Sequence, residues 1–263
     1  GDVDASGGRD PYLDEGDARD FRSRYEDNLV PSRRGTLTIK YNESIVNAAN
    51  TMLTVYYHNG DEWQNVGGVV NTGSQTIQVP FQGFGFYMVM KTRESYDDVV
   101  THDFARDAME TLYAKGIMPA YSGSSFGANR DMSRGEFATM LVKALALPID
   151  AGPYRDSNER DPLEPTFTDV RPSRDTWDYE YKYIETAARA GIIRGKQPGY
   201  FRPDDPLTRE EAAIMIARAM NLKVGTLEAA ETALAKSFTD AKDVSYYAAP
   251  SVLAVTKAKL MNG

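Results

Sequence analysis

The chain has 263 residues, of which 41% are hydrophobic and 26% charged, with a formal net charge of −8. This composition is typical of a globular protein with room for two domains. The acidic balance argues against nucleic acid or an anionic membrane surface as a partner, and no apolar run reaches the ~20 residues of a membrane span. With no cysteine and only two histidines, disulfides, cysteine nucleophiles and a histidine-rich metal centre are excluded, and no cofactor is predicted.

Residues 1–34 are rich in Asp, Arg and Gly and poor in apolar residues. This composition predicts a linker or the end of a preceding domain. The chain starts at Gly1 without a signal peptide, which indicates a fragment or a mature product. The stretch DVDASG at 2–7 opens like a calcium loop, but Leu13 stands where such a loop carries its last glutamate. A flexible linker is the favoured interpretation, and calcium binding is the alternative.

Residues 35–93 change to short runs of β-forming residues. Turn residues separate these runs at Asn59-Gly60 and at 71–73. Six strands at this spacing predict a small β-sandwich, and the arrangement resembles the immunoglobulin-like modules that precede anchoring repeats in secreted surface proteins. Its aromatic residues pack in the core or, alternatively, line a sugar-binding face. They are Tyr41, Tyr56, Tyr57, Trp63, Phe84, Phe86 and Tyr87.

Residues 94–263 repeat themselves. Residues 104–147 superimpose on 179–222 with a constant offset of 75 and no gap, which aligns SRGE at 133–136 with TREE at 208–211. A third copy begins at Ser237 and contains the first half of the unit. The repeats therefore span about 97–149, 166–224 and, in part, 237–263. For the partial copy we expect that the polypeptide was cut or that an unseen partner completes it.

Each full unit is predicted to form two helices joined by an irregular loop. Gly191 ends the first helix in the left-handed conformation, and Phe201 pins the loop to the core. Thr208 and Glu211 form a capping box, which makes Arg209 the first residue of the second helix. One helical hairpin cannot bury its apolar face alone, so the copies are expected to pack into a compact bundle.

Six landmarks in order carry a resemblance to the S-layer homology (SLH) family: FTD at 167–169, an aromatic five residues before Ile184, GII at 191–193, Gly195, GYFRP at 199–203 and TREE at 208–211. The resemblance implies a pseudo-threefold helical bundle. It also implies non-covalent attachment of a surface protein to the bacterial cell wall or S-layer, outside the cell. The typical partner of such repeats is a pyruvylated secondary polysaccharide linked to peptidoglycan, bound in grooves between repeats.

The resemblance assigns ligand contact to Arg134 and Arg209. A helix N-terminus offers free N–H groups to an anion, and a guanidinium adds two donors suited to a carboxylate. Without a ligand, a cation there opposes the helix dipole at a cost of roughly 0.3–1 kcal/mol. The alternative is an ion pair with Asp131, Asp204 or Asp205. The flanking motif residues are also candidates: Ser133, Thr208, Glu136 and Glu211.

Further candidate residues each have two interpretations. Trp177 and Tyr179 compete for the family's aromatic position, which Tyr247 takes in the third copy, and these rings stack on a sugar or plug the bundle. Asp169 and Asp240 cap the first helix or bind ligand hydroxyls. Gly195 and Gly263 permit close approach of the sugar or form a turn. The first repeat departs from the pattern in its loop, and at most two grooves are expected to bind.

Catalysis is not expected. No pair of carboxylates lies in a motif that sets glycosidase geometry, and neither His58 nor His102 has a hydrolase context. The predicted chain is thus α+β in separate domains, a β-sandwich followed by an all-α bundle, and its predicted role is a non-catalytic anchor. Two alternatives stay open: a structural S-layer lattice component that self-associates through its sandwich, and the anchor fragment of a surface-bound glycanase.

Overall fold

The computed structural model describes residues 35–42, 52–92, 96–151, 165–172 and 175–262. The predicted linker at 1–34, its calcium-like loop and the candidate Gly263 lie outside the described residues. Within them, no helix is long and apolar enough to cross a membrane.

Six strands form the N-terminal β region, as predicted, in two three-stranded sheets with the orders β1-β5-β4 and β3-β2-β6. Each pair of neighbouring strands is antiparallel. The strands are β1 (Thr36–Lys40), β2 (Leu53–His58), β3 (Trp63–Gly67), β4 (Val69–Asn71), β5 (Thr76–Pro80) and β6 (Phe86–Lys91). The predicted turns both form: Asn59 Oδ1 accepts from Asp61 N–H and Glu62 N–H between β2 and β3, and Asn71 Oδ1 accepts from Ser74 N–H between β4 and β5.

The two sheets share one apolar cluster, to which β2 contributes Leu53 and Val55, and β5 contributes Ile77 and Val79. Alternation along each strand sends every second side chain inward, which is why these four are at most 1% exposed. The predicted aromatics divide. Tyr41 and Tyr57 are buried and Tyr87 packs against the cluster, whereas Trp63, Phe84 and Phe86 are exposed. The sandwich and its immunoglobulin-like class stay predictions.

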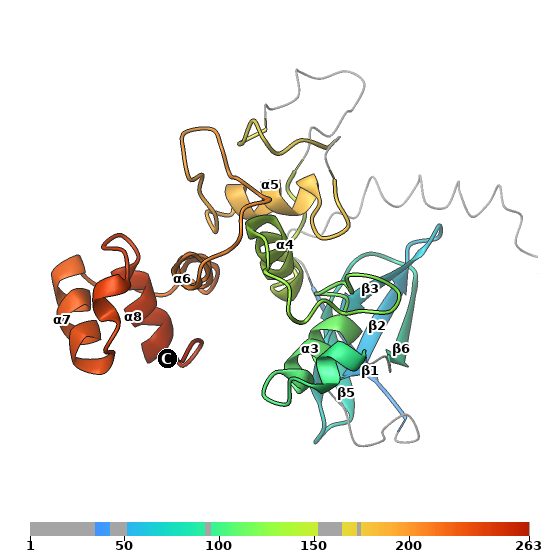
Figure 1. The fold of residues 1–263 in the computed structure, drawn as a ribbon. Coiled ribbons are helices and arrows are strands. Elements are labelled where there is room, and N and C mark those ends of the chain that lie inside the picture. Colours follow the sequence, from blue (N-terminus) through green and yellow to red (C-terminus); the bar gives the residue numbers. More distant parts are fainter. Residues whose placement is uncertain (1–34, 43–51, 93–95, 152–164, 173–174, 263) are drawn as a thin grey trace, which may run out of the picture.

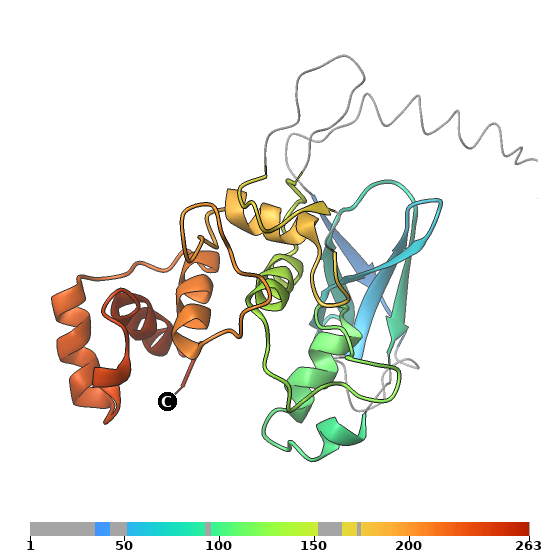
Figure 2. The ribbon, with the colours of Figure 1, turned by 45° about the horizontal axis from the view of Figure 1, so that its top comes forward.

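The second part of the chain is helical. Its elements are α2 (Asp97–Val100), α3 (Arg106–Ala114), α4 (Arg134–Ala144), α5 (Tyr181–Arg189), α6 (Arg209–Ala219), α7 (Leu227–Ser237), the short 3₁₀ helix η4 (Ala241–Asp243) and α8 (Ala249–Lys257). Figures 1 and 2 show α3 beside the sheets, α4 and α5 next, then α6, and α7 and α8 at the far end from the sheets.

Packing between the helices follows the repeat. The second helix of one unit packs on the first helix of the next, α4 against α5 and α6 against α8. Helix α7 was not predicted from the repeat; it lies between the second and third units, begins at a Thr226 cap and packs on α8. Units therefore bury their apolar faces on one another, as expected. The pseudo-threefold arrangement stays a prediction.

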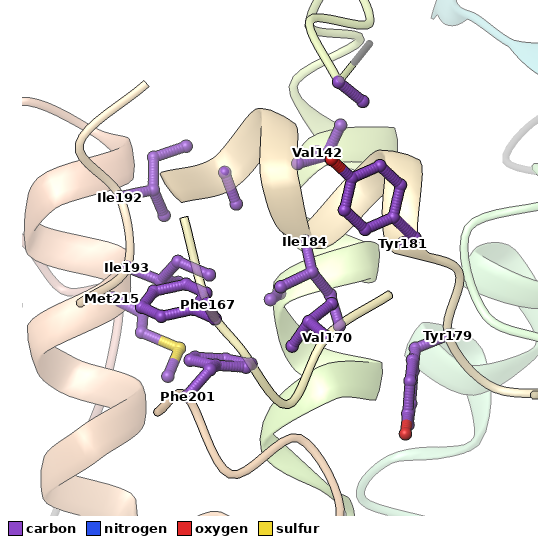
Figure 3. Close-up of a cluster of buried hydrophobic side chains, with 13 residues drawn as sticks. Val142, Phe167, Val170, Tyr179, Tyr181, Ile184, Ile192, Ile193, Phe201 and Met215 are labelled. Atoms are coloured by element: carbon purple, nitrogen blue, oxygen red, sulfur yellow. The ribbon is translucent and has the colours of Figure 1, made fainter. Parts of the chain in front are cut away.

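The largest apolar cluster holds the loop of the second unit in place (Figure 3). Phe201 is fully buried, and its ring stacks on Phe167 at 5.3 Å between centroids. Ile184 of α5 and Met215 of α6 belong to the same cluster. Burial of one such side chain stabilises the fold by about 1.5–3 kcal/mol. Phe201 thus pins the loop to the core, as the sequence predicted.

Glycines end the first helices of the two complete units. Gly116 and Gly191 follow α3 and α5 with φ of 68° and 74°, the left-handed conformation that glycine adopts without a Cβ penalty. After α8 the same position is Lys259, which has a φ of 57°. The third unit therefore keeps the left-handed conformation at the end of its helix but has a lysine where the other units have glycine.

Lys115 joins the β region to the first helical unit. Its Nζ donates to the carbonyl oxygens of Leu53 (3.0 Å) and Gly68 (2.5 Å), and burial lowers its pKa. In return, Asn65 Nδ2 donates to the carbonyl oxygen of Ala114 at 2.8 Å. The end of α3 is thereby bonded to two strands and to the loop between β3 and β4.

Candidate functional site

The second helices begin as the motif predicts. Helix α6 starts at Arg209 behind a complete capping box, in which Thr208 Oγ1 accepts from Glu211 N–H and Glu211 Oε2 accepts from Thr208 N–H. Helix α4 starts at Arg134, and Ser133 Oγ accepts from Glu136 N–H. Each arginine is therefore the first helical residue.

The side chain of Arg134 extends from the first unit and contacts the second. Its Nε donates to the Phe201 carbonyl oxygen at 3.0 Å, Nη2 to that of Arg194 at 3.4 Å, and Nη1 forms an ion pair with Glu211 at 3.0 Å. The guanidinium also lies 4.7 Å from the centroid of the Phe201 ring. Only 4% of Arg134 is exposed. An ion pair with Asp131, Asp204 or Asp205 was the predicted alternative, but the partner is Glu211.

A pocket of about 380 Å³ opens beside this arginine. Four cations line it, namely Arg134, Arg194, Lys196 and Arg218, with one acid, Glu211. Glu211 already pairs with Arg134 and Lys196. Burial and the nearby Arg194 lower the pKa of Arg218, and neither of these two guanidiniums forms an ion pair within the described part of the chain. The pocket therefore has a surplus of positive charge that an anion can neutralise.

The third unit adds an aromatic ring to the same pocket. Tyr247 lines it and is 57% exposed. Its hydroxyl donates to Glu210 Oε1 at 3.0 Å, and Glu210 also accepts from Ser245 N–H and Oγ–H. Burial alone would raise the pKa of Glu210, but these hydrogen bonds lower it. An ionised Glu210 thus fixes the ring at the pocket mouth.

Gly195 lines the pocket, and the loop around it leaves no room for a side chain. A Cβ atom there would be 2.6 Å from the Gln197 carbonyl oxygen and 2.7 Å from that of Tyr200, closer than real Cβ contacts. Any larger residue would push the loop out of place. The tight turn places Arg194 and Lys196, the two neighbours of Gly195, along the pocket.

Arg209 and Asp240 lie elsewhere, in a groove of about 820 Å³ between α6, α7 and α8, together with Thr208. Arg209 is exposed, and its Nη2 donates to the Asn262 carbonyl oxygen at 2.5 Å. Asn262 occupies the same repeat position as Arg194, whose carbonyl accepts from Arg134. The two arginines therefore make one equivalent contact, but only Arg134 is enclosed.

The remaining predicted residues have mainly local partners. Asp169 accepts from Phe201 N–H and Arg202 N–H at 2.9 and 2.8 Å, so it holds the loop and does not cap α5. Tyr179 is 6% exposed, and its hydroxyl donates to Asp204, which leaves little ring surface for a sugar. Trp177 is 47% exposed and lies outside the Arg134 pocket.

Glu136 is buried and accepts from Arg130 Nη2 at 2.6 Å. Its guanidinium partner therefore comes from its own unit, whereas the guanidinium partner of Glu211 comes from the preceding unit. Of the residues predicted from the motif, Arg134, Glu211, Gly195 and Tyr247 come together in one pocket. Sequence reasoning missed Arg194, Lys196 and Arg218. The first unit has Pro119 and Tyr121 at the first two positions, so no repeated cation marks them, and the cation that recurs at the third, Lys143, lies outside the recognised landmarks.

This architecture defines a class of protein: helical-hairpin repeats in which an arginine at the start of the second helix contacts the next unit. Residues 95–138 and 166–213 match the model of the S-layer homology domain. The chain thus contains S-layer homology repeats, as the sequence landmarks indicated.

Comparison with curated proteins gives relatives of two kinds. An amylopullulanase from Thermoanaerobacterium thermosulfurigenes is 28% identical over 213 residues, which cover 80% of this chain and 10% of that protein. A surface layer protein from Brevibacillus choshinensis is 30% identical over 112 residues, 43% of this chain and 9% of that protein. The S-layer protein EA1 of Bacillus anthracis is 26% identical over 130 residues, 49% of this chain and 13% of that protein. The chain spans a small fraction of the length of each.

Proposed function

We propose that this protein is a non-catalytic anchor that holds its parent polypeptide at the bacterial cell surface, in the cell wall or S-layer. S-layer homology repeats are anchoring modules, and they occupy much of the helical region. The division into a β domain at 35–93 and an anchoring region at 94–263 belongs to this proposal. Its ligand is an anionic polysaccharide of the wall, and the Arg134 pocket carries the assignment.

The single observation behind the ligand class is the charge of that pocket. Arg194 and Arg218 approach each other without an acid between them, beside the ion pair of Arg134 and Glu211. A pyruvyl ketal on a sugar presents one carboxylate, which two guanidiniums can bind with charge-assisted hydrogen bonds. The exposed ring of Tyr247 lies where the sugar of such a group can stack. A pyruvylated secondary cell-wall polysaccharide fits both features.

A second candidate function rests on the β region. Phe86, Met88 and Met90 project from one face of the edge strand β6 and are each more than 40% exposed, with Trp63 of β3 on the same sheet. An exposed apolar face on an edge strand favours association with another protein. By this alternative the chain is a structural lattice component. The relatives named as glycanases support a third version, in which the anchor serves a surface-bound enzyme.

Co-sedimentation with purified Gram-positive cell-wall sacculi tests the anchor. Wild type is compared with Arg194→Ala/Arg218→Met, which removes the two guanidiniums without an ion pair and keeps most of the half-buried stem of Arg218. Loss of charge-assisted hydrogen bonds at about 1.5–3 kcal/mol each predicts binding at least about tenfold weaker. The matched control, Lys223→Ala/Lys242→Ala, removes two exposed cations outside the pocket and is expected to bind like wild type.

The same assay with sacculi stripped of pyruvyl ketals by mild acid tests the ligand class. Wild type is expected to lose binding to the level of the double variant. Equal binding by wild type and the double variant on intact sacculi would contradict the assignment of the pocket. Sedimentation velocity without polysaccharide separates the lattice alternative, because only that alternative predicts self-association of the chain alone.

A further inference from the structure

A second corner lies where the first and second units meet, outside the Arg134 pocket. It consists of Tyr121 and Arg130 of the first unit and Trp177 of the second. The two units are related by an offset of 75, so Tyr121 corresponds to Lys196 and Glu136 to Glu211. Glu211 receives Arg134 from the preceding unit. Glu136 instead receives Arg130 from its own loop, with 2.6 Å between Nη2 and Oε2. The positive charge of Arg130, which an incoming anion would otherwise neutralise, is therefore already neutralised by Glu136 of the same unit.

Two aromatic rings are held open at this corner. Tyr121 and Trp177 lie 5.4 Å apart between centroids with planes at 81°, and they are 54% and 47% exposed. The Arg130 guanidinium lies 4.8 Å from the Trp177 centroid and 5.9 Å from that of Tyr121. Glu136 is 1% exposed, and its carboxylate accepts a hydrogen bond from the guanidinium and so holds it in place. The rings thus have a rigid support, which lowers the entropic cost of binding a ligand on them.

Polar groups border the rings. Asp178 accepts from Thr176 Oγ1–H at 2.6 Å and lies within 3.5 Å of Ser133 Oγ. Arg130 Nε is buried and has no hydrogen-bond partner within the described residues. The Arg130 guanidinium is already neutralised by the Glu136 carboxylate, and its Nη1 donates to the Asp131 carbonyl oxygen. This balance disfavours an anion, in contrast to the surplus of cations around Arg134.

We infer that the Tyr121–Trp177 corner is a binding site for an uncharged pyranose. The C–H face of such a sugar stacks on an aromatic ring, and its hydroxyl groups reach the carboxylate and hydroxyl groups at the border. The inference rests on the proposed function in that the natural ligand is a wall glycan. The corner takes a neutral sugar residue of it, and the Arg134 pocket takes an anionic one. The two units then differ in specificity because of the residues at positions 121 and 196.

The chain has two tryptophans, which gives a direct test. In a Trp63→Phe background, Trp177 is the sole tryptophan, and its fluorescence is titrated with tri-N-acetylchitotriose as the neutral probe and with sodium pyruvate as the anionic one. We expect a saturable change with the oligosaccharide and none with pyruvate. Tyr121→Ala is expected to weaken the response at least about fivefold, and Tyr121→Phe to retain it.

Two outcomes would overturn the inference: no saturable change with the oligosaccharide, or a change that Tyr121→Ala leaves intact while its melting temperature matches that of the background. Arg194→Ala, which alters only the other pocket, is expected to leave this titration unchanged. If Arg194→Ala/Arg218→Met sediments normally with sacculi while the fluorescence response is present, the proposed anionic pocket fails and the neutral site stands. If the double variant fails to sediment with sacculi while the fluorescence response is absent, the neutral site alone is removed and the anionic pocket stands.

Discussion

Arg134 and Arg209 have the same place in the repeat and different surroundings. A cation at the first turn opposes the helix dipole by about 0.3–1 kcal/mol. Arg134 offsets this with the Glu211 carboxylate, two carbonyl oxygens and the Phe201 ring. Arg209 has one carbonyl partner and is exposed. The motif therefore places an arginine at the first residue of the second helix. The packing of the neighbouring unit determines whether that arginine is buried.

Lys259 offers a test of the repeat at a single residue. Its φ of 57° lies in the left-handed region, where a side chain costs about 1–2 kcal/mol relative to glycine. Lys259→Gly relieves this strain, but the greater entropy of glycine in the unfolded chain offsets part of the gain. The free energy of unfolding is therefore expected to rise by about 0.5–1 kcal/mol. Urea denaturation followed by circular dichroism measures the difference.

The matched variant is Gly191→Lys, at the equivalent residue of the second unit. A Cβ atom on Gly191 meets nothing within 4 Å, so its effect reports backbone strain alone. We expect a loss of about 1 kcal/mol. A stabilising Gly191→Lys, or a destabilising Lys259→Gly, would show that the two positions are not equivalent.

At the scale of the element, Asp98 organises the loop of the first unit. Its carboxylate accepts from the N–H groups of Phe126, Gly127 and Ala128 and from the Ser125 hydroxyl. Burial would raise its pKa, but these bonds together lower it from 3.8 to about 2. A lowered pKa means that the ionised form stabilises the fold above pH 3.8 and that this contribution is lost as the pH falls toward 2.

Asp98→Asn is therefore expected to lower the melting temperature at pH 5–7 and to have a progressively smaller effect below pH 3.8. Thermal unfolding followed by circular dichroism across pH 2–7 measures this difference. Asp97→Asn, which removes a charge from the neighbouring exposed residue, is the control. A difference between wild type and Asp98→Asn that stays constant down to pH 2 would contradict the assignment.

The junction between the β region and α3 depends on Lys115. Its Nζ donates to the carbonyl oxygens of Leu53 in β2 and of Gly68 between β3 and β4, and hydrogen bonds from charged groups contribute about 1.5–3 kcal/mol. Lys115→Met keeps the stem and leaves these carbonyls without their donor. We expect calorimetry to show one transition for wild type and a separate, lower transition for the β region in the variant. Lys40→Met, at an exposed residue of β1, should behave as wild type.

Across the whole molecule, local patterns in the sequence predicted the elements but not their partners. Alternation and turn residues located all six strands, and the offset of 75 located α4 and α6 with the Thr208 capping box. Helix α7 was missed because it lies outside the repeat. The contact between Arg134 and Glu211 could not be read from spacing, since it depends on how one unit packs on the next.

The pocket is lined by residues of all three units, and Tyr247 is its contribution from the third. Tyr247 reaches it from the third unit and is placed by Glu210 of the second. If its ring stacks on the bound sugar, Tyr247→Ala should weaken binding to pyruvylated sacculi by about tenfold, and Tyr247→Phe, which keeps the ring, by less than about threefold. Co-sedimentation at several protein concentrations measures both affinities.

Tyr246→Ala is the matched control for this experiment. Tyr246 is the adjacent residue and is 68% exposed, but it does not line the pocket. Because both tyrosines are exposed, neither alanine variant should change the melting temperature appreciably. Equal binding by the two alanine variants would mean that the third unit contributes no ring to the ligand, and the anionic pocket would then consist of the first and second units alone.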